Sequence, residues 1–256
     1  MKLLRMPTAK DGEWWVVCHD YVVKDEWLRS FRPIHVFTHL SQAIVDNKTE
    51  MFNLSIALEN KLFSSRNLSF EVRKAISEIG DPAYKNPFLK SYDPYQRIIS
   101  FIESYLESIY SALEITAKIN RAIDNNLPMG FREQSKKYEM FSFEKNKWLP
   151  MFYDIRSELT HYNTLMFDHK ETSIIIGFST ARDLEHFDKG IKYKIDVSML
   201  LSFHIQLFDL LDSWAKELLK KVDENYEIQV ATLIDVKTPP KIEKIKAKVL
   251  LDMVLK

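Results

Sequence analysis

The segment from 94 to 124 constrains the fold more than any other part of this chain of 256 residues. Its apolar residues recur every three or four positions over about 30 residues, which is the period of one face of an α-helix. Asp93 is the predicted N-cap, Pro94 fits the first helical position, and Gln96 stands where it can close a capping box. A helix of this length has to bury its apolar stripe against other helices, so we expect a mainly α-helical bundle.

The composition supports this expectation and excludes some classes of function. The chain has 5 glycines, about 2% against a usual value of about 7%, which leaves little material for the tight turns of a many-stranded sandwich. Lys plus Arg and Asp plus Glu both number 36, so the formal net charge is zero. Binding to nucleic acid driven by overall charge is therefore excluded, whereas a local basic patch remains open.

Periodicity predicts further helices and several strands along the chain. Helical spacing is found in five segments: 40–62, 70–79 (capped by Ser69 and ended by Gly80), 150–167, 197–221 and a final helix after Pro240. The runs at 173–180 and 191–197 predict a β-hairpin inserted into the bundle, residues 226–236 alternate as a strand does, and 13–23 fits a strand or a buried apolar segment.

We divide the chain accordingly into three regions. These are an N-terminal helical region (1–90), a helical bundle with its β-hairpin at 173–197 (91–222) and a C-terminal strand–helix extension (223–256). No stretch approaches 18 uninterrupted apolar residues, and the first residues lack the apolar run of a signal peptide. The single cysteine, Cys18, cannot form an internal disulfide. We therefore expect a soluble cytoplasmic protein with no membrane contact.

A polar group on the predicted helix 150–167 is the best candidate for a site, and a metal is the first interpretation. Glu158 and His161 form a Glu-x-x-His unit, and the long preceding helix offers carboxylates at Glu103, Glu107 and Glu114. Di-iron bundles need a second Glu-x-x-His unit, and this is the only one in the chain. We therefore expect no metal and no cofactor, and favour a surface ion pair for Glu158.

A serine nucleophile is the second interpretation of the same group. Ser157 and His161 are four residues apart, with Asp154 one turn before them. A hydrolytic serine needs an oxyanion hole and usually a Gly-x-Ser-x-Gly turn, which the sequence does not contain. We exclude a serine hydrolase.

The third interpretation combines Arg156 and His161, which stand in an Arg-x4-His spacing. With a long helix before it and another after it, this pattern resembles the HEPN domains (higher eukaryotes and prokaryotes nucleotide-binding) over about residues 91–222. The resemblance implies an all-helical bundle, and many members of that family are RNases that need no metal. Ser157 stands where active members usually carry Asn, Asp or His, and the hairpin is an elaboration that only some members have.

The chemistry implied by this resemblance uses the RNA 2′-hydroxyl as the nucleophile. His161 titrates near neutral pH and can act as general base or acid. Arg156 stays charged and can hold phosphate oxygens through its planar fork, while Ser157, Glu158 and Thr160 are the candidates for orienting the substrate. The expected products carry a 2′,3′-cyclic phosphate and a 5′-hydroxyl.

Geometry adds the expectation of a homodimer. Positions five apart diverge by about 140° on a helix, so Arg156 and His161 do not share a face. Two copies of the motif facing each other across a two-fold axis would complete one cleft, as the resemblance also implies. The resemblance further suggests a role in defence or in a toxin–antitoxin pair. The alternative is a catalytically inactive module that dimerises or binds a protein partner, with Arg156 in an ion pair and His161 as a helix cap.

Two other features carry weaker expectations. His204 interrupts an apolar helical stripe and is interpreted as a core histidine with satisfied hydrogen bonds. The lysine-rich segment 241–248 is interpreted as a solvated helix face, and it is also the best candidate for a patch that contacts phosphate.

Overall fold

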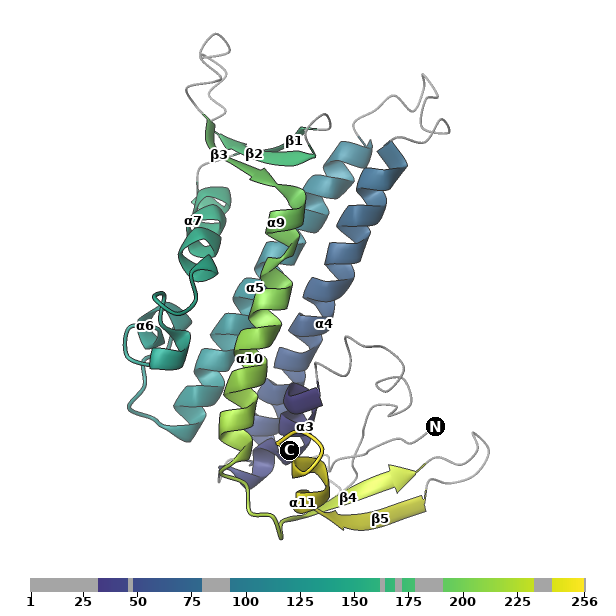
Figure 1. The fold of residues 1–256 in the computed structure, drawn as a ribbon, viewed down its shortest axis with the longest axis vertical. Coiled ribbons are helices and arrows are strands. Elements are labelled where there is room, and N and C mark those ends of the chain that lie inside the picture. Colours follow the sequence, from purple (N-terminus) through teal and green to yellow (C-terminus); the bar gives the residue numbers. More distant parts are fainter. Residues whose placement is uncertain are drawn as a thin grey trace. The chain divides into compact units, whose positions relative to one another are not determined.

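The computed structural model describes residues 32–45, 48–79, 93–161, 164–168, 172–177, 191–232 and 241–255 (Figure 1). Its helices are α3 (Arg32–Leu40), α4 (Lys48–Ile79), α5 (Asp93–Ile123), α6 (Phe131–Gln134), α7 (Trp148–His161), α9 (Val197–Leu201), α10 (Phe203–Leu219) and α11 (Ala247–Leu251), with 3₁₀ turns η1 (Ser41–Ala43) and η3 (Glu139–Phe141). Its strands are β1 (Thr164–Asp168), β2 (Ser173–Gly177), β3 (Ile191–Asp196), β4 (Glu227–Thr232) and β5 (Lys241–Lys246). The prediction of a mainly helical fold with a β-hairpin is confirmed.

The chain divides into two compact units, and α4, α5 and α10 each contribute residues to both. Of the described residues, unit 1 contains those up to Glu59, those from Ile115 to Gly130 and those from Phe208 onward. Unit 2 contains those from Asn60 to Glu114 and from Phe131 to Leu207. The segment 13–23, predicted as a strand or a buried apolar segment, lies outside the described residues. The side chains of Asp93 and Pro94, predicted to begin the long helix, are not described either, whereas that of Gln96 is.

Trp214 is the centre of the core of unit 1. Its indole ring is fully buried, and the ring centroid lies 5.0 Å from that of Phe37 on α3. Its Nε1 donates a hydrogen bond of 2.8 Å to Oδ1 of Asn120 on α5, so this buried polar atom is satisfied. One residue of α10 thereby fixes both α3 and the end of α5.

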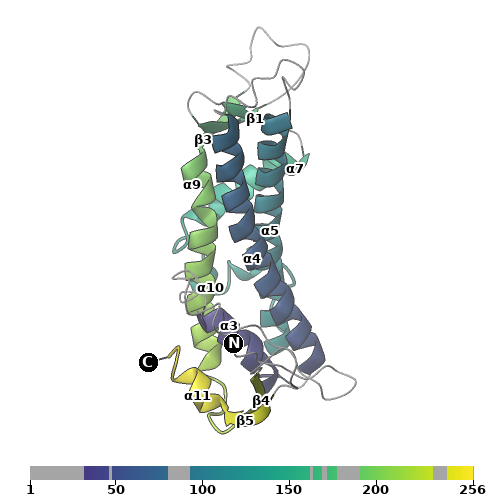
Figure 2. The same ribbon diagram turned by 90° about the vertical axis from the view of Figure 1, so that its right-hand side faces the viewer.

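Unit 1 also contains the antiparallel hairpin of β4 and β5, which α11 follows directly (Figure 2). The pairing runs in register from Glu227 opposite Lys246 to Thr232 opposite Lys241. The N–H of Ala247 donates to the carbonyl of Tyr226 at 2.7 Å, which joins the start of α11 to the base of the hairpin.

Aromatic side chains pack α7 against the start of α10 in unit 2. The ring of Phe203 lies 5.8 Å from that of Trp148 and 5.9 Å from that of Phe152, measured between centroids. The antiparallel sheet β1-β2-β3 follows α7, and the side chain of Asp196 at the end of β3 caps α9 by accepting from the N–H of Ser198 at 2.7 Å. The aromatic contacts therefore hold α7, the helix that carries Arg156, against the start of α10.

Three predicted helix boundaries are wrong and a fourth predicted helix is interrupted, because a contact distant in the sequence or a local hydrogen bond decides the structure. The predicted helices 40–62 and 70–79 are joined in one continuous α4, which begins at Lys48, and Ser41–Ala43 before it form the 3₁₀ turn η1. Ser69 does not cap a helix: its hydroxyl donates to the carbonyl of Arg66 at 2.7 Å, inside α4. The described part of α4 extends to Ile79, and the predicted end at Gly80 lies outside the described residues.

The other two corrections concern strands that sequence periodicity predicts as helix. The helix predicted to reach 167 ends at His161, because residues 164–168 pair with β2 in the register Leu165 opposite Ile176. The final helix predicted after Pro240 is β5 up to Lys246, and only α11 is helical. Backbone pairing with a neighbouring strand decides both segments.

The predicted helix 197–221 is divided at Ser202 into α9 and α10, and Tyr105 explains the break. In an unbroken helix the N–H of His204 would donate to the carbonyl of Leu200. Instead that N–H donates to the hydroxyl of Tyr105 at 2.9 Å, and the hydroxyl donates onward to the carbonyl of Leu200 at 3.2 Å. The buried hydroxyl is thus inserted into the hydrogen-bond ladder of the helix.

We therefore expect Tyr105→Phe to lower the free energy of unfolding by about 1–3 kcal/mol, because the buried N–H of His204 loses its acceptor. Urea unfolding followed by circular dichroism measures this, with Tyr138→Phe on a half-buried tyrosine as the control. An unfolding free energy equal to that of the wild type would contradict the role given to the inserted hydroxyl.

Candidate functional site

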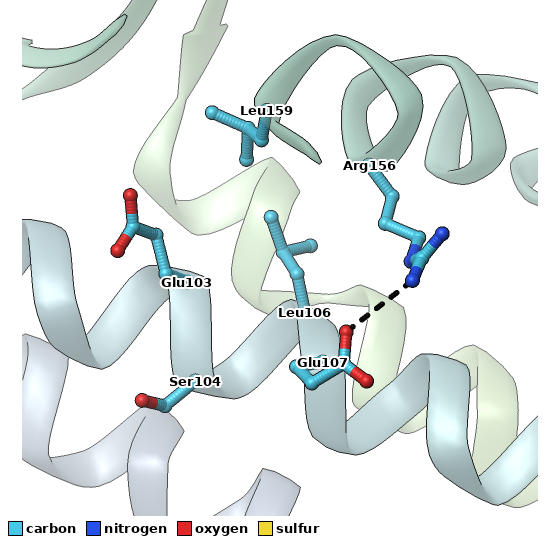
Figure 3. Close-up of a pocket in the computed structure, with 6 residues that line it drawn as sticks. All are labelled: Glu103, Ser104, Leu106, Glu107, Arg156 and Leu159. Atoms are coloured by element: carbon cyan, nitrogen blue, oxygen red, sulfur yellow. Dashed lines mark ion pairs between the residues drawn. The ribbon is translucent and has the colours of Figure 1, made fainter. Parts of the chain in front are cut away.

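A cavity of about 460 Å³ lies between α5 and α7 in unit 2. Its lining consists of two carboxylates, one guanidinium, one hydroxyl and two leucines: Glu103, Ser104, Leu106, Glu107, Arg156 and Leu159 (Figure 3). Arg156 comes from the predicted Arg-x4-His motif, and Glu103 and Glu107 are carboxylates that the sequence offers from the long helix. The structure therefore brings these predicted residues together at one place.

The guanidinium of Arg156 contacts two side chains of α5. Its Cζ lies 3.5 Å from the centre of the Tyr110 ring on α5, and its Nη2 lies 3.6 Å from Oε2 of Glu107. The Arg156 side chain is 24% exposed and that of Glu107 is 59% exposed. An exposed ion pair contributes about 0–1 kcal/mol, whereas a cation over an aromatic face contributes about 0.5–2 kcal/mol, more as water is excluded. Of these two contacts, the one with Tyr110 therefore holds Arg156 more strongly.

Further aromatic side chains support Tyr110. The ring of Tyr153 meets it edge to face at 6.2 Å and stacks on Phe143 at 5.8 Å. Burial raises the pKa of both tyrosines above the ordinary phenol value of 10.0, so both stay neutral. The buried hydroxyl of Tyr153 has no hydrogen-bond partner within the described residues. Sequence reasoning missed Tyr110 and Tyr153. The one feature of the sequence that could have indicated Tyr110 is its position one turn after Glu107.

The structure places the other predicted site residues of α7 apart from this cavity or leaves their side chains undescribed. Ser157 is exposed and Glu158 is half-buried. Thr160 and His161 belong to the last turn of α7, and their side chains lie outside the described part. Since α7 is unbroken from Arg156 to His161, these two backbone positions are rotated about 140° from each other.

A metal site was one interpretation of these carboxylates and of the Glu-x-x-His unit. Within the described ranges, no three side chains of His, Cys, Asp or Glu are grouped so that they can hold a metal ion.

His204 is a core histidine with satisfied hydrogen bonds, as the sequence predicts. The residue is 7% exposed, and its Nδ1 lies 2.5 Å from the carbonyl of Leu201. Burial lowers the pKa of His204, so it is neutral at pH 7. We assign it to the α9–α10 junction rather than to a site.

The lysines of 241–248 do not form the predicted solvated helix face, because most of the segment is β5. Lys244 and Lys248 each place Nζ 3.5 Å from a carboxylate oxygen, of Glu227 and Glu224 respectively. Lys246 donates to the side chain of Asn225 at 3.1 Å. Acidic neighbours thus offset the positive charge of this segment, which makes it a weak phosphate patch.

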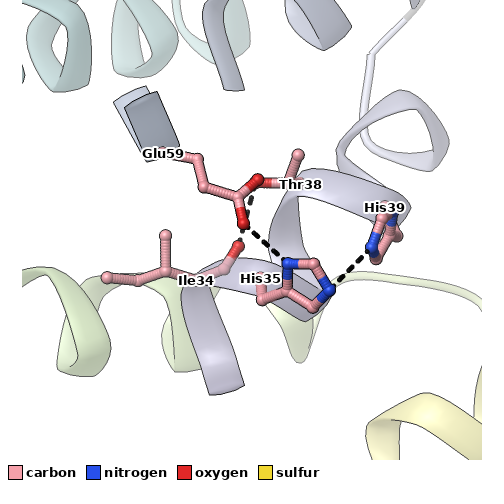
Figure 4. Close-up of polar contacts among 5 residues, drawn as sticks. All are labelled: Ile34, His35, Thr38, His39 and Glu59. Carbon is pink, nitrogen blue, oxygen red and sulfur yellow. Dashed lines mark hydrogen bonds and ion pairs between the residues drawn. The ribbon is translucent and has the colours of Figure 1, made fainter. Parts of the chain in front are cut away.

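A second polar cluster, which sequence reasoning missed, is buried in unit 1 (Figure 4). The Nδ1 of His35 lies 2.7 Å from Oε1 of Glu59, and the Nε2 of His35 lies 3.1 Å from the Nε2 of His39. When Glu59 is ionised and His35 neutral, His35 donates from Nδ1 and accepts at Nε2 from His39. The spacing His35-x3-His39 on one helical face was the available signal.

This cluster makes the stability of the fold depend on pH. Burial, and secondarily the neighbouring His35, lower the pKa of His39 well below its ordinary value of 6.5. The unfolded chain therefore binds a proton that the folded chain excludes, so the stabilisation is complete above about pH 6.5 and is lost as the pH falls below it.

We expect the free energy of unfolding to decrease between pH 7.5 and pH 5.5, and to decrease less in His39→Gln than in the wild type. Urea unfolding at the two pH values gives the change in unfolding free energy for each protein. Any destabilisation by the substitution that does not depend on pH cancels in this change. Burial also lowers the pKa of His204, which leaves a residual slope in the variant. An equally steep decrease in His39→Gln would contradict the assignment.

Within the described ranges, no helix has the length and apolar content needed to cross a membrane. The comparisons with known proteins give no match, whether with family models, with curated proteins or with solved structures. The function therefore has to be inferred from the residues of this chain and their geometry.

Proposed function

We propose that this protein binds RNA and cleaves its backbone without a metal ion, through Arg156 and His161. One observation carries the proposal: Arg156 of the Arg-x4-His motif lines a cavity and is oriented there by Tyr110. A guanidinium that is already oriented loses less conformational entropy when it binds a phosphate. The resemblance to HEPN domains supports the same assignment.

Arg156 has the role of binding the phosphate that is cleaved. Its planar fork offers two parallel N–H donors to phosphate oxygens and neutralises the charge that develops there. Tyr110 covers one face of the guanidinium, so its N–H donors lie along the edge of the plane. Glu107 competes for that edge, but its carboxylate is exposed and 3.6 Å away, so a phosphate can replace it.

His161 has the role of transferring the proton in this proposal. As a general base it takes the proton of the RNA 2′-hydroxyl, whose oxygen then bonds to the adjacent phosphorus while the bond to the 5′-oxygen breaks. The leaving 5′-oxygen takes a proton from an acid, which is the protonated His161 of the same or of a second copy. The products are a 2′,3′-cyclic phosphate and a 5′-hydroxyl, with no metal needed.

A homodimer belongs to the same proposal. Arg156 and His161 stand on positions about 140° apart on α7, so one copy alone presents them in different directions. Two motifs facing each other across a two-fold axis would supply both groups to one phosphate. A cytoplasmic location, and a role in defence or in a toxin–antitoxin pair, complete the proposal.

A catalytically inactive interaction module is the second candidate, and the contacts of Arg156 favour it. Glu107 and Tyr110 already engage the guanidinium, and two carboxylates line the cavity against one guanidinium. Ser157 in place of Asn, Asp or His supports the same alternative. In that case Arg156 stabilises the packing of α7 on α5 and the bundle binds a second copy or a protein partner.

Cleavage of RNA in EDTA decides between the two candidates. We expect the purified protein to cut a panel of single-stranded and structured RNAs to products with 2′,3′-cyclic phosphate ends. Arg156→Ala and His161→Ala should each reduce the rate at least about 100-fold, which is the lower range for the loss of an acid–base group or of a charge-stabilising donor.

Arg73→Ala, which changes an exposed arginine of α4, is the matched control and should retain the wild-type rate. Circular dichroism and sedimentation establish that each variant is folded and has the oligomeric state of the wild type. Cleavage that persists in both Arg156→Ala and His161→Ala would contradict the proposal and favour the interaction module.

A further inference from the structure

We infer that the cavity beside Arg156 is a guanine subsite, in which Glu103 binds the edge of one base of the RNA. This inference rests on the proposed function and names the base that stands next to the phosphate on Arg156. It depends on the size of the cavity, the pattern of its walls and the charge of its rim.

The size and the walls of the cavity suit one nucleoside. A volume of about 460 Å³ falls within the range of about 300–1,000 Å³ that small-ligand sites have. Half-buried Leu159 on α7 supplies apolar surface for one flat face of a base, and buried Leu106 on α5 closes the floor of the cavity (Figure 3). The polar groups stand around these leucines and can contact the edge of the ring.

The two carboxylates lower the stability of α5, the helix that carries them. Glu103 and Glu107 are one turn apart on α5, and like charges at this spacing destabilise a helix. Arg156 offsets the charge of Glu107. Glu103 is exposed, and neither a hydrogen bond nor an ion pair joins it to another described residue. A ligand that donates N–H groups would give this carboxylate its partner.

Guanine is the base whose edge fits an ionised carboxylate. Its N1–H and N2–H are neighbouring donors, and each can donate to one carboxylate oxygen. Adenine and cytosine place a ring nitrogen acceptor beside the amino group, and uracil has one N–H between two carbonyl acceptors. Each of these three bases therefore sets a lone pair against the carboxylate, which is repulsive.

The charges also set the orientation of the RNA. The carboxylates repel a phosphate and accept from a base, while the guanidinium attracts the phosphate. The backbone is thus directed to Arg156 and the base to Glu103. These charged groups at the cavity would let a chain with no net charge bind RNA at one particular nucleotide rather than through its overall charge.

Fluorescence anisotropy with uncut RNA tests the subsite apart from catalysis. The probes are labelled heptanucleotides of uridine with a central G, A, C or U, carrying 2′-O-methyl groups so that no 2′-hydroxyl can attack. We expect the full-length protein to bind the central-G probe at least about tenfold more tightly than the central-U probe, as one good bidentate base contact provides.

The ratio of the two affinities is the readout in the variants. In Glu103→Gln it should fall to about one, because the new amide group presents a donor beside an acceptor and no longer matches guanine. Glu133→Gln, which changes an exposed glutamate of α6, is the matched control and should keep the wild-type ratio.

The outcomes separate the subsite from the proposed function. Equal affinity for the four probes, or a guanine preference that Glu103→Gln retains, overturns the guanine subsite while RNA binding stands. Failure of all four probes to bind overturns both the proposed function and the subsite.

Discussion

The stacking of Arg156 on Tyr110 is the contact on which the candidate site depends. A guanidinium 3.5 Å above a tyrosine ring has one face covered and its donors directed along the edge, which fixes a side chain that otherwise samples many rotamers. The neutral, largely buried Tyr153 supports Tyr110 from the side of α7 itself. The same contact therefore packs α7 on α5 and orients the cation, as the proposed function requires of Arg156.

The site also depends on how α7 is held in unit 2. Trp148 and Phe152 pack against Phe203 at the start of α10, directly after the break that the hydroxyl of Tyr105 makes in the helical ladder. Since α5 carries Tyr105 and Tyr110, one helix both shapes the α9–α10 junction and anchors Arg156. A polar group inserted into a helix costs little when each of its hydrogen bonds is satisfied, as it is at Tyr105.

The sequence allowed the helical class to be predicted, because helical periodicity is a local property, and a local motif drew attention to Arg156, which lines the cavity. The end of α7 and the strand β5 escaped prediction since Leu165 and Ile245 fit a helical spacing as well as a strand, and only pairing with β2 and β4 decides. Tyr110 was missed for a similar reason: its place one turn after Glu107 is a weak signal until its partner from α7 is known. The cluster of His35 and Glu59 joins residues 24 positions apart, which spacing alone does not bring together.

The central claim is that Arg156 contacts an RNA phosphate, and the salt dependence of binding tests it most directly. Each phosphate neutralised on a single strand adds about −0.7 to the slope of log affinity against log salt. Anisotropy of a fluorescent single-stranded RNA, measured from low to moderate salt, gives this slope for the wild type and for Arg156→Ala. Contact with a phosphate predicts a slope that is shallower by about 0.7 in the variant for each phosphate that Arg156 binds. Equal slopes in the two proteins would show that Arg156 binds no phosphate and would contradict the claim.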